Sequence, residues 1–253
     1  MDLGSLKDES GMSPLMIVAE HNPNPEVITA MAKAGADVNA GDEYGKTPLM
    51  LAARSNSNPE VISVLLTNGA EVEAGDFFGR TPLMSAAFKS SPEVVSLLLK
   101  AGAEVDACSE GGMTPLMCAA SLNSNPEVIS VLLSAGAEIE FQSPFLKWTA
   151  LTRGALQNPN PEVISVLLKA GAKVEAKGKD GMTPLMVAAR SNSNPEVVAL
   201  LLKAGANLEV RDKNGMTPLM YAASSNSNPE VISVLLRAGA NLEVRDKNGM
   251  TTL

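Results

Sequence analysis

The side chains that could carry chemistry are few in this 253-residue chain. It has one histidine, His21, and two cysteines, Cys108 and Cys118. A zinc site or a nucleophile–histidine pair needs more such groups than the chain offers. Two cysteines are also too few for a disulfide framework, and free thiols are typical of a reducing compartment. We therefore expect no catalytic residue, no metal site and no cofactor.

One stretch is similar to a phosphate-binding loop. Residues 40–47 read Ala-Gly-Asp-Glu-Tyr-Gly-Lys-Thr, which is one residue short of that motif. No hydrophobic strand leads into it, as the motif requires. The same Gly-x-Thr ending recurs as Gly-Arg-Thr at 79–81 and Gly-Met-Thr at 181–183. The stretch is therefore explained by a repeat that runs along the chain, and we expect no nucleotide site there.

This repeat opens each time with a threonine or serine, and successive copies are 34, 34, 33, 35, 34, 34 and 34 residues apart. A fixed period of this size indicates a stacked array in which each unit contacts only its neighbours. We predict one elongated domain over residues 1–253, with units starting near 8, 42, 76, 109, 144, 178 and 212 and a partial eighth unit at 246–253. The opening residues are Ser13, Thr47, Thr81, Thr114, Thr149, Thr183, Thr217 and Thr251.

A single unit reads as two helices and a loop. Thr47-Pro48 predicts a helix start, because the hydroxyl can cap free backbone donors and proline suits the first helical position. A polar turn follows, and Asn58 then caps a second helix. Gly69 lies just past the end of that helix, where a left-handed residue is needed. Residues 75–79 contain the tip of a hairpin that leads to the next unit.

This unit resembles the ankyrin repeat, whose hallmark is Thr-Pro-Leu-His-x-Ala with a period near 33 residues. The resemblance covers residues 8–253 and implies an all-α repeat fold, an ankyrin solenoid of stacked helix-turn-helix units with β-hairpin loops. Methionine replaces the motif histidine in six units, so we expect packing to replace the polar link that this histidine makes in the family. These residues are Met16, Met50, Met84, Met117, Met186 and Met220.

Repeat 5 is irregular. Lys147 replaces the hairpin glycine, Pro144 occupies the usual aspartate position, Ala150 replaces proline and Thr152 replaces methionine. Its hairpin is one residue longer. Loop drift and a reshaped contact finger both explain these changes. Either way, we expect this repeat to be the weakest point of the array.

The ankyrin resemblance implies that partners contact the hairpin tips and the inner face of the first helices. Six of the eight aromatic residues fall in those positions. Exposed aromatic clusters mark contact sites, although the same rings could instead staple adjacent hairpins. We predict a protein-binding site on the concave and hairpin face of repeats 2–5. Its residues are Tyr44, Lys46, Arg54, Phe77, Phe78, Arg80, Phe88, Lys89, Phe145, Leu146, Trp148 and Leu156.

Charge narrows the class of partner. The net charge of −8 and the pI near 4.8 argue against nucleic acid and anionic membranes. The contact positions of repeats 2 and 3 nevertheless hold four basic residues and one acidic residue. A basic, aromatic face on an acidic protein suits an acidic-apolar protein segment. We expect a non-catalytic protein–protein interaction scaffold. The alternatives are a structural spacer or self-assembling solenoid, and a targeting domain of a larger enzyme.

The two ends of the sequence suggest a compartment and a second partner. No signal peptide or membrane-spanning segment is visible, which indicates a cytoplasmic protein and leaves open a secreted effector or a removed signal. In repeat 7 the second helix keeps the apolar pattern Val231, Ile232, Leu235 and Leu236 where no complete unit follows. Arrays need a polar outer face at the terminal unit. We expect a second copy of the chain, as a homodimer, or further sequence to cover this end.

Overall fold

The computed structural model describes residues 7–251, and within that range the chain forms seven pairs of α-helices and no β-strand. None of the helices in this range is long and apolar enough to cross a membrane. The pairs are α1 (Pro14–His21) and α2 (Pro25–Lys33), α3 (Pro48–Ser55) and α4 (Pro59–Thr67), α5 (Pro82–Lys89) and α6 (Pro92–Lys100), α7 (Pro115–Leu122) and α8 (Pro126–Ser134), α9 (Ala150–Gln157) and α10 (Pro161–Lys169), α11 (Pro184–Ser191) and α12 (Pro195–Lys203), α13 (Pro218–Ser225) and α14 (Pro229–Arg237).

Local capping sets where the helices begin. In the first helix of repeat 2, Thr47 Oγ1 accepts a hydrogen bond from the backbone N–H of Met50 at 3.4 Å, and Pro48 is the first helical residue. In the second helix, Asn58 Oδ1 accepts from the backbone N–H of Glu60 at 3.0 Å. Gly69 then follows with φ +91°, a left-handed conformation that costs glycine little. The helix boundaries expected from the sequence are confirmed.

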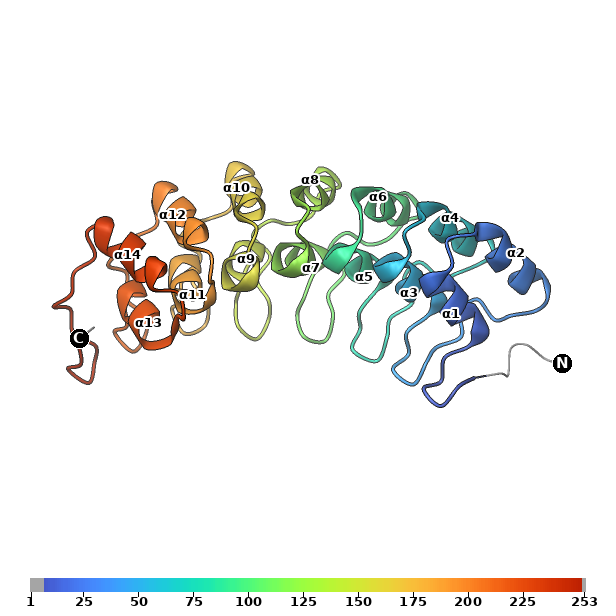
Figure 1. The fold of residues 1–253 in the computed structure, drawn as a ribbon, viewed down its shortest axis with the longest axis horizontal. Helices are drawn as coiled ribbons and strands as arrows, with labels where there is room; N and C mark the ends of the chain where they lie inside the picture. The colour runs from blue at the N-terminus through green and yellow to red at the C-terminus, as the bar shows by residue number, and fades with distance from the viewer. Residues whose placement is uncertain (1–6, 252–253) are drawn as a thin grey trace. The chain divides into compact units, whose positions relative to one another are not determined.

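The chain divides into two compact units. Unit 1 contains Met1–Ala119 and Ser130–Ala137, and unit 2 contains Ala120–Ile129 and Glu138–Leu253. In unit 1, α1, α3 and α5 pack in one row while α2, α4 and α6 pack in another, as Figure 1 shows. In unit 2, α9, α11 and α13 form one row and α10, α12 and α14 the other. Each unit therefore repeats a two-layer arrangement of helices.

The core between the rows is aliphatic. Leu49, Val61, Ile62 and Leu65 of repeat 2 are completely buried. The six methionines that replace the motif histidine are buried as well, as the sequence led us to expect. Met16 also accepts a hydrogen bond on Sδ from the backbone N–H of Ser13 at 3.3 Å. Apolar packing thus fills the space that a histidine occupies in the family motif.

A polar link between successive repeats exists nevertheless, and it lies in the turn between the two helices. Asn192 is almost fully buried, and its Nδ2 donates to the carbonyl oxygens of Ala155 at 3.1 Å and Asn158 at 3.0 Å. Its Oδ1 accepts from the backbone N–H of Asn194 at 2.9 Å. The sequence alone indicated only a polar turn at this position. The same set of bonds is made by Asn56, Asn158 and Asn226, among others.

The loop before each first helix, which we call a finger, reverses direction like a hairpin. In the finger of repeat 2 the backbone N–H of Asp42 donates to the carbonyl of Lys46 at 3.0 Å. Too few residues pair for a strand to form in the described range. Neighbouring fingers are also joined, because the N–H of Phe77 donates to the carbonyl of Tyr44 and the N–H of Glu110 donates to the carbonyl of Phe78, both at 2.9 Å. The fingers of repeats 2–4 in unit 1 are therefore held in register.

An aspartate at the base of the finger fixes its shape. Asp42 Oδ1 accepts from the backbone N–H groups of Tyr44 and Lys46, both at 2.8 Å. The same pattern occurs in every unit that has an aspartate five residues before the opening threonine or serine. These residues are Asp8, Asp42, Asp76, Asp212 and Asp246.

In the finger of repeat 5, the residue that takes the aspartate position differs from the one expected from the sequence. Ser143, not Pro144, takes the aspartate's role, because its buried Oγ accepts from the backbone N–H of Trp148 at 3.2 Å. Lys147 has φ +57° and is the only non-glycine residue in the described range with positive φ. Gly45 and Gly181, at the equivalent position, have φ +77° and +81°. A lysine in this conformation stores strain that glycine avoids.

Replacing Lys147 with glycine is expected to stabilise unit 2 by about 1 kcal/mol, because the left-handed conformation no longer opposes a side chain. The reciprocal change, Gly181→Lys, introduces the same strain into repeat 6 and should destabilise by a similar amount. Urea denaturation followed by circular dichroism measures both changes. If Lys147→Gly lowers the unfolding midpoint, the backbone conformation at this position is not strained.

Candidate functional site

The groups that could carry chemistry are dispersed over the described residues. His21 is exposed and lies 3.6 Å from Glu20, while Cys118 is buried in the core and Cys108 is an exposed free thiol. No cluster of three or more histidine, cysteine or acidic side chains with the geometry of a metal site occurs in the described range. In the stretch similar to a phosphate loop, the hydroxyl of Thr47 caps α3.

The predicted contact residues of repeats 2 and 3 lie within unit 1. We call Tyr44, Lys46, Phe77, Phe78 and Arg80 the finger surface, because all five lie on the fingers. Tyr44 is 48% exposed, Phe77 68% and Phe78 51%. An aromatic ring that stays exposed to water forgoes the favourable free energy that its burial would provide. The fold gives the three rings little cover, so their placement on adjacent fingers favours a contact role.

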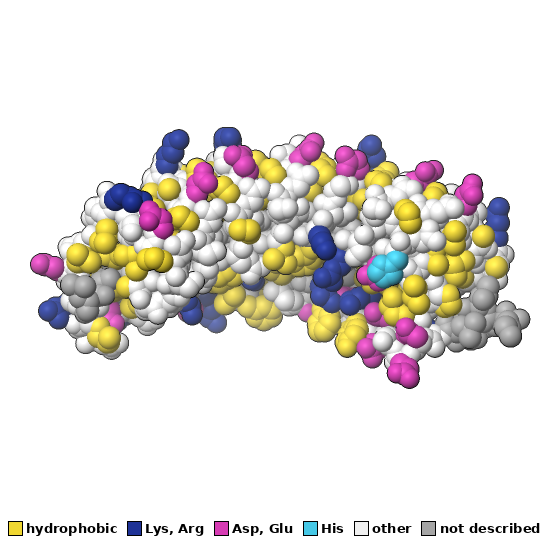
Figure 2. Space-filling model, in the orientation of Figure 1, with side chains coloured by type: hydrophobic (Ala, Val, Ile, Leu, Met, Phe, Trp, Pro, Cys, Tyr) yellow, Lys and Arg dark blue, Asp and Glu magenta, His cyan; other side chains and the backbone are white. Residues whose placement is uncertain are grey.

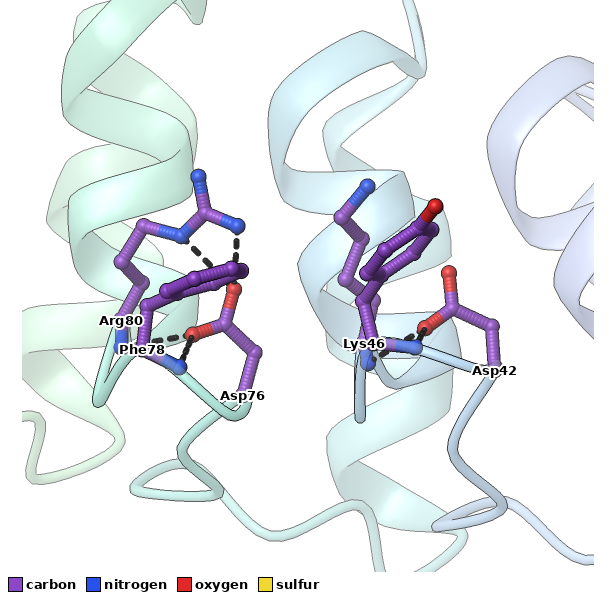
Figure 3. A network of polar contacts seen from close by, with 6 residues as sticks. Asp42, Lys46, Asp76, Phe78 and Arg80 are labelled. Atoms are coloured by element: carbon purple, nitrogen blue, oxygen red, sulfur yellow. Dashed lines mark hydrogen bonds and ion pairs between the residues drawn. The ribbon is translucent and has the colours of Figure 1, made fainter.

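Each of the two fingers pairs an aromatic ring with a cation. Lys46 Nζ lies 5.3 Å from the centroid of the Tyr44 ring, and Arg80 Cζ lies 4.9 Å from the centroid of the Phe78 ring. Figure 3 shows the two fingers side by side, with the cation of each over its ring. Cation–π contacts of this kind are worth about 0.5–1 kcal/mol at exposed sites. The finger surface thus presents apolar rings with positive charge directly above them.

The finger of repeat 3 is anchored more firmly than that of repeat 2. Asp76 is almost buried, and its Oδ1 accepts from the backbone N–H groups of Phe78 and Arg80, both at 2.9 Å. Its Oδ2 also accepts from Arg80 Nε at 2.7 Å and Nη2 at 2.6 Å. One carboxylate therefore fixes both the backbone that carries Phe78 and the guanidinium that covers its ring.

Phe77 fits both roles that the sequence left open for the aromatic residues, a contact with a partner and a staple between adjacent fingers. A Cβ added at Gly45 would lie 2.8 Å from Phe77 Cδ1, so this ring rests directly on the backbone of the preceding finger. The ring acts as a staple on one side. With 68% of the residue exposed, its other side stays available.

Three further predicted residues lie at the ends of the first helices of unit 1. Arg54 and Lys89 are exposed, and Phe88 is half-buried. Arg54 and Lys89 line a pocket of about 220 Å³ between the turns of repeats 2 and 3. Figure 2 shows a group of Lys and Arg side chains on one face of unit 1, next to the single histidine. Positive charge thus gathers on an otherwise acidic chain.

The predicted residues of repeat 5 belong to unit 2, and they separate into two groups. Phe145 is 63% exposed and Leu146 38% exposed, as expected for contact residues. Trp148 and Leu156 instead pack against a buried cluster formed by Met182, Met186, Val187 and Val210. A Cβ at Gly178 would lie 2.7 Å from the indole ring, and Arg153 Cζ lies 5.1 Å from the ring centroid. Trp148 and Leu156 are therefore partly covered by packing within unit 2, and their contact role stays a prediction.

Tyr221 packs against the same cluster. Its hydroxyl donates to Asp212 Oδ2 at 2.8 Å, and burial together with this carboxylate raises the pKa of Tyr221 to about 12.

We expect an ultraviolet titration to show a phenolate step near pH 12 that is absent in Tyr221→Phe. Because the pKa is raised in the folded state, the protonated Tyr221 hydroxyl contributes its full stabilisation below about pH 10. That contribution is lost as the pH rises through the folded-state value. Loss of a step near pH 10 in the variant would contradict the bond.

The last repeat buries part of its apolar pattern and exposes the rest, including Leu242 at 39% and Met250 at 66%. Val231 and Leu235 of α14 are completely buried, and Ile232 is half-buried. Leu236 remains 38% exposed. The homodimer expected at this end stays a prediction.

Comparisons with known proteins agree with this architecture. The family model for ankyrin repeats in three copies matches residues 2–76, 58–143, 123–212 and 151–246. No curated protein matches the chain. Among solved structures, the ankyrin repeat domain of human ASB11 matches with a TM-score of 0.73 and 29% sequence identity, covering 91% of this chain and 99% of that chain. Ankyrin repeats generally mediate protein–protein interactions. The chain belongs to the ankyrin repeat family.

Proposed function

We propose that unit 1 binds a protein segment that carries apolar and acidic side chains, and that the finger surface makes the contact. The observation that supports this most directly is the pair of cation-covered rings on two adjacent fingers. Apolar side chains of the partner would cover Phe77 and the free edges of the other rings. Its carboxylates would face Lys46, because the charge of Arg80 is already paired with Asp76.

The exposure and the charge of the finger surface both favour binding of such a segment. Aromatic and arginine residues dominate the binding energy of protein interfaces, and the finger surface concentrates both kinds. Arg80 is already ion-paired with Asp76, so it is held in place before a partner arrives. Such preorganisation lowers the entropic cost of binding. The ring of Phe77 on the backbone of Gly45 is preorganised in the same way.

A peptide selection on the full chain tests this function. Random peptides displayed on phage are selected against the wild-type protein, and the dissociation constants of the best binders are measured by isothermal titration. We expect the binders to combine acidic with apolar residues. Phe77→Ser/Phe78→Ser should weaken them at least tenfold, since each ring truncation removes about 1–2 kcal/mol of contact. Affinity should also fall as salt rises.

A matched variant controls for nonspecific effects. Lys213 and Asn214 occupy the same two positions in the finger of repeat 7, in unit 2. Lys213→Ser/Asn214→Ser should leave peptide affinity unchanged, and circular dichroism should show both variants folded. If the selected peptides bind the Phe77→Ser/Phe78→Ser variant as well as the wild type, the finger surface is not the binding site.

A further inference from the structure

Repeat 3 differs from every other repeat in the turn between its helices. In the other six complete units this turn contains Asn-x-Asn-Pro, with both asparagines present. Repeat 3 reads Lys89-Ser90-Ser91-Pro92, which is one residue shorter and has no asparagine. Elsewhere the second asparagine donates to the preceding turn, as when Asn58 Nδ2 donates to the carbonyl of Pro23 at 2.7 Å. Repeat 3 has no amide to make the equivalent bond.

The missing amides coincide with a pocket of about 220 Å³ between the turns of repeats 2 and 3. Among its lining residues Asn56 is buried, whereas Arg54 and Lys89 are exposed. The lining carries no acidic side chain. It consists of Arg54, Ser55, Asn56, Ser57, Lys89, Ser90, Ser91 and Val94.

The two cations of this pocket have no ion pair in the described part of the chain. Repeat 6 provides an internal comparison, because residues 190–195 have the same sequence, Arg-Ser-Asn-Ser-Asn-Pro, as residues 54–59. Arg190 lies over the Tyr221 ring of the next repeat, 5.9 Å from its centroid. The residue equivalent to Tyr221 in repeat 3 is Ser85, which offers Arg54 no ring. The position of Lys89 is occupied by the uncharged Ser225 in repeat 7, so the second cation is also particular to repeat 3 in this comparison.

The start of α6 also differs from the other second helices. Ser91 precedes this nine-residue helix, and its side chain makes no capping bond to the backbone of the first turn. The asparagines described as N-caps of the other second helices make such a bond, as Asn58 does to the N–H of Glu60. The exposed Glu93 follows, and a hydrogen bond from Ser91 lowers the pKa of its carboxyl. That carboxylate borders the pocket at Ser91, while the charged side chains of the lining itself are Arg54 and Lys89.

We propose that this pocket binds the phosphate group of a phosphorylated side chain. The proposal rests on the function proposed above, because the phosphate would belong to the protein segment that crosses unit 1. A phosphate monoester carries a charge between about −1.5 and −2 at neutral pH, which matches two cations better than the single charge of a carboxylate does. It also offers three strong acceptor oxygens. The guanidinium of Arg54, the ammonium of Lys89 and the hydroxyls of Ser55 and Ser57 supply the donors.

Nuclear magnetic resonance of the ¹⁵N-labelled full chain at pH 7.5 tests this proposal with small probes. The probe is N-acetyl-O-phosphoserine methylamide, and inorganic phosphate is a second arm. N-acetyl-aspartate methylamide at equal ionic strength is the carboxylate comparison. We expect saturable shifts of the backbone amides of residues 54–57 and 89–94 with the phosphoserine probe. The aspartate probe should bind at least tenfold more weakly.

Charge-removing variants locate the site. Arg54→Gln and Lys89→Gln should each weaken the phosphoserine probe about tenfold, while Arg190→Gln, in the identical sequence of repeat 6, should have no effect. All three side chains are exposed, so the variants should fold. Equal affinity for the aspartate probe would overturn the proposal in favour of a carboxylate site. Binding of inorganic phosphate alone would overturn the side-chain assignment, and unsaturable shifts would overturn the site. The small probes do not contact the fingers. The phosphoserine titration can therefore succeed or fail independently of the peptide selection.

Discussion

Replacing Asn192 with alanine is expected to lower the free energy of unfolding by about 4 kcal/mol, since each buried polar group left without a partner costs about 1–3 kcal/mol. Asn192 is 2% exposed. The substitution removes two Nδ2 donations to the turn of repeat 5 and one Oδ1 acceptance from the backbone N–H of Asn194. Two carbonyl oxygens and one N–H group would then stay buried without these partners. Urea denaturation measures the change.

A second asparagine of unit 2 serves as the control. Asn207 is exposed, and its Oδ1 accepts a single hydrogen bond, from the backbone N–H of Glu209 at 2.9 Å. Asn207→Ala should cost no more than about 0.5 kcal/mol, the usual range for a surface substitution. If the two variants unfold with the same free energy, the asparagine bonds do not couple successive repeats.

Replacing Asp76 with alanine is expected to destabilise unit 1 by about 3 kcal/mol, because hydrogen bonds to a charged group are worth about 1.5–3 kcal/mol each and part of this site is exposed. The carboxylate holds two backbone N–H groups and two nitrogens of Arg80. Its loss also frees the finger that carries Phe78. We therefore expect weaker binding of the peptides selected on the finger surface, in addition to the loss of stability measured by urea denaturation.

The matched variant is Asp42→Ala. Asp42 accepts the same two backbone hydrogen bonds in repeat 2, but the basic side chain of that finger lies over Tyr44 instead. Asp42→Ala should therefore cost about 1 kcal/mol less than Asp76→Ala, which is the worth of a half-exposed ion pair. Asp76→Asn keeps an oxygen for the backbone donors and should lose only that smaller part. Equal costs for the two alanine variants would show that the Arg80 contact contributes no stability.

The sequence by itself determined the local structure of this protein. A hydroxyl and a proline begin a helix wherever they occur, and a glycine past its end closes it, because capping depends on residues within one or two turns. The repeat period then determined that helices stack on equivalent helices. The exposure of Tyr44, Phe77 and Phe78 also followed, since these residues lie at loop tips.

Only the tertiary structure decided which aromatic residues are free. Phe145 and Trp148 are three residues apart in one loop, yet Trp148 packs on Gly178 and the cluster around Met186, and Phe145 stays exposed. The neighbours that bury Trp148 lie about one repeat further along the chain, so no local pattern identifies them.

The asparagine bonds and the basic pocket of repeat 3 also depend on residues about one repeat apart, so the sequence did not predict them. The amide of Asn192 finds its acceptors 34 and 37 residues earlier in the sequence. The pocket lies beside the turn of repeat 3, which lacks such an amide. The sequence shows the shortened turn, but a space between two turns depends on how their side chains fill it. That filling is a property of packing between repeats and not of either repeat alone.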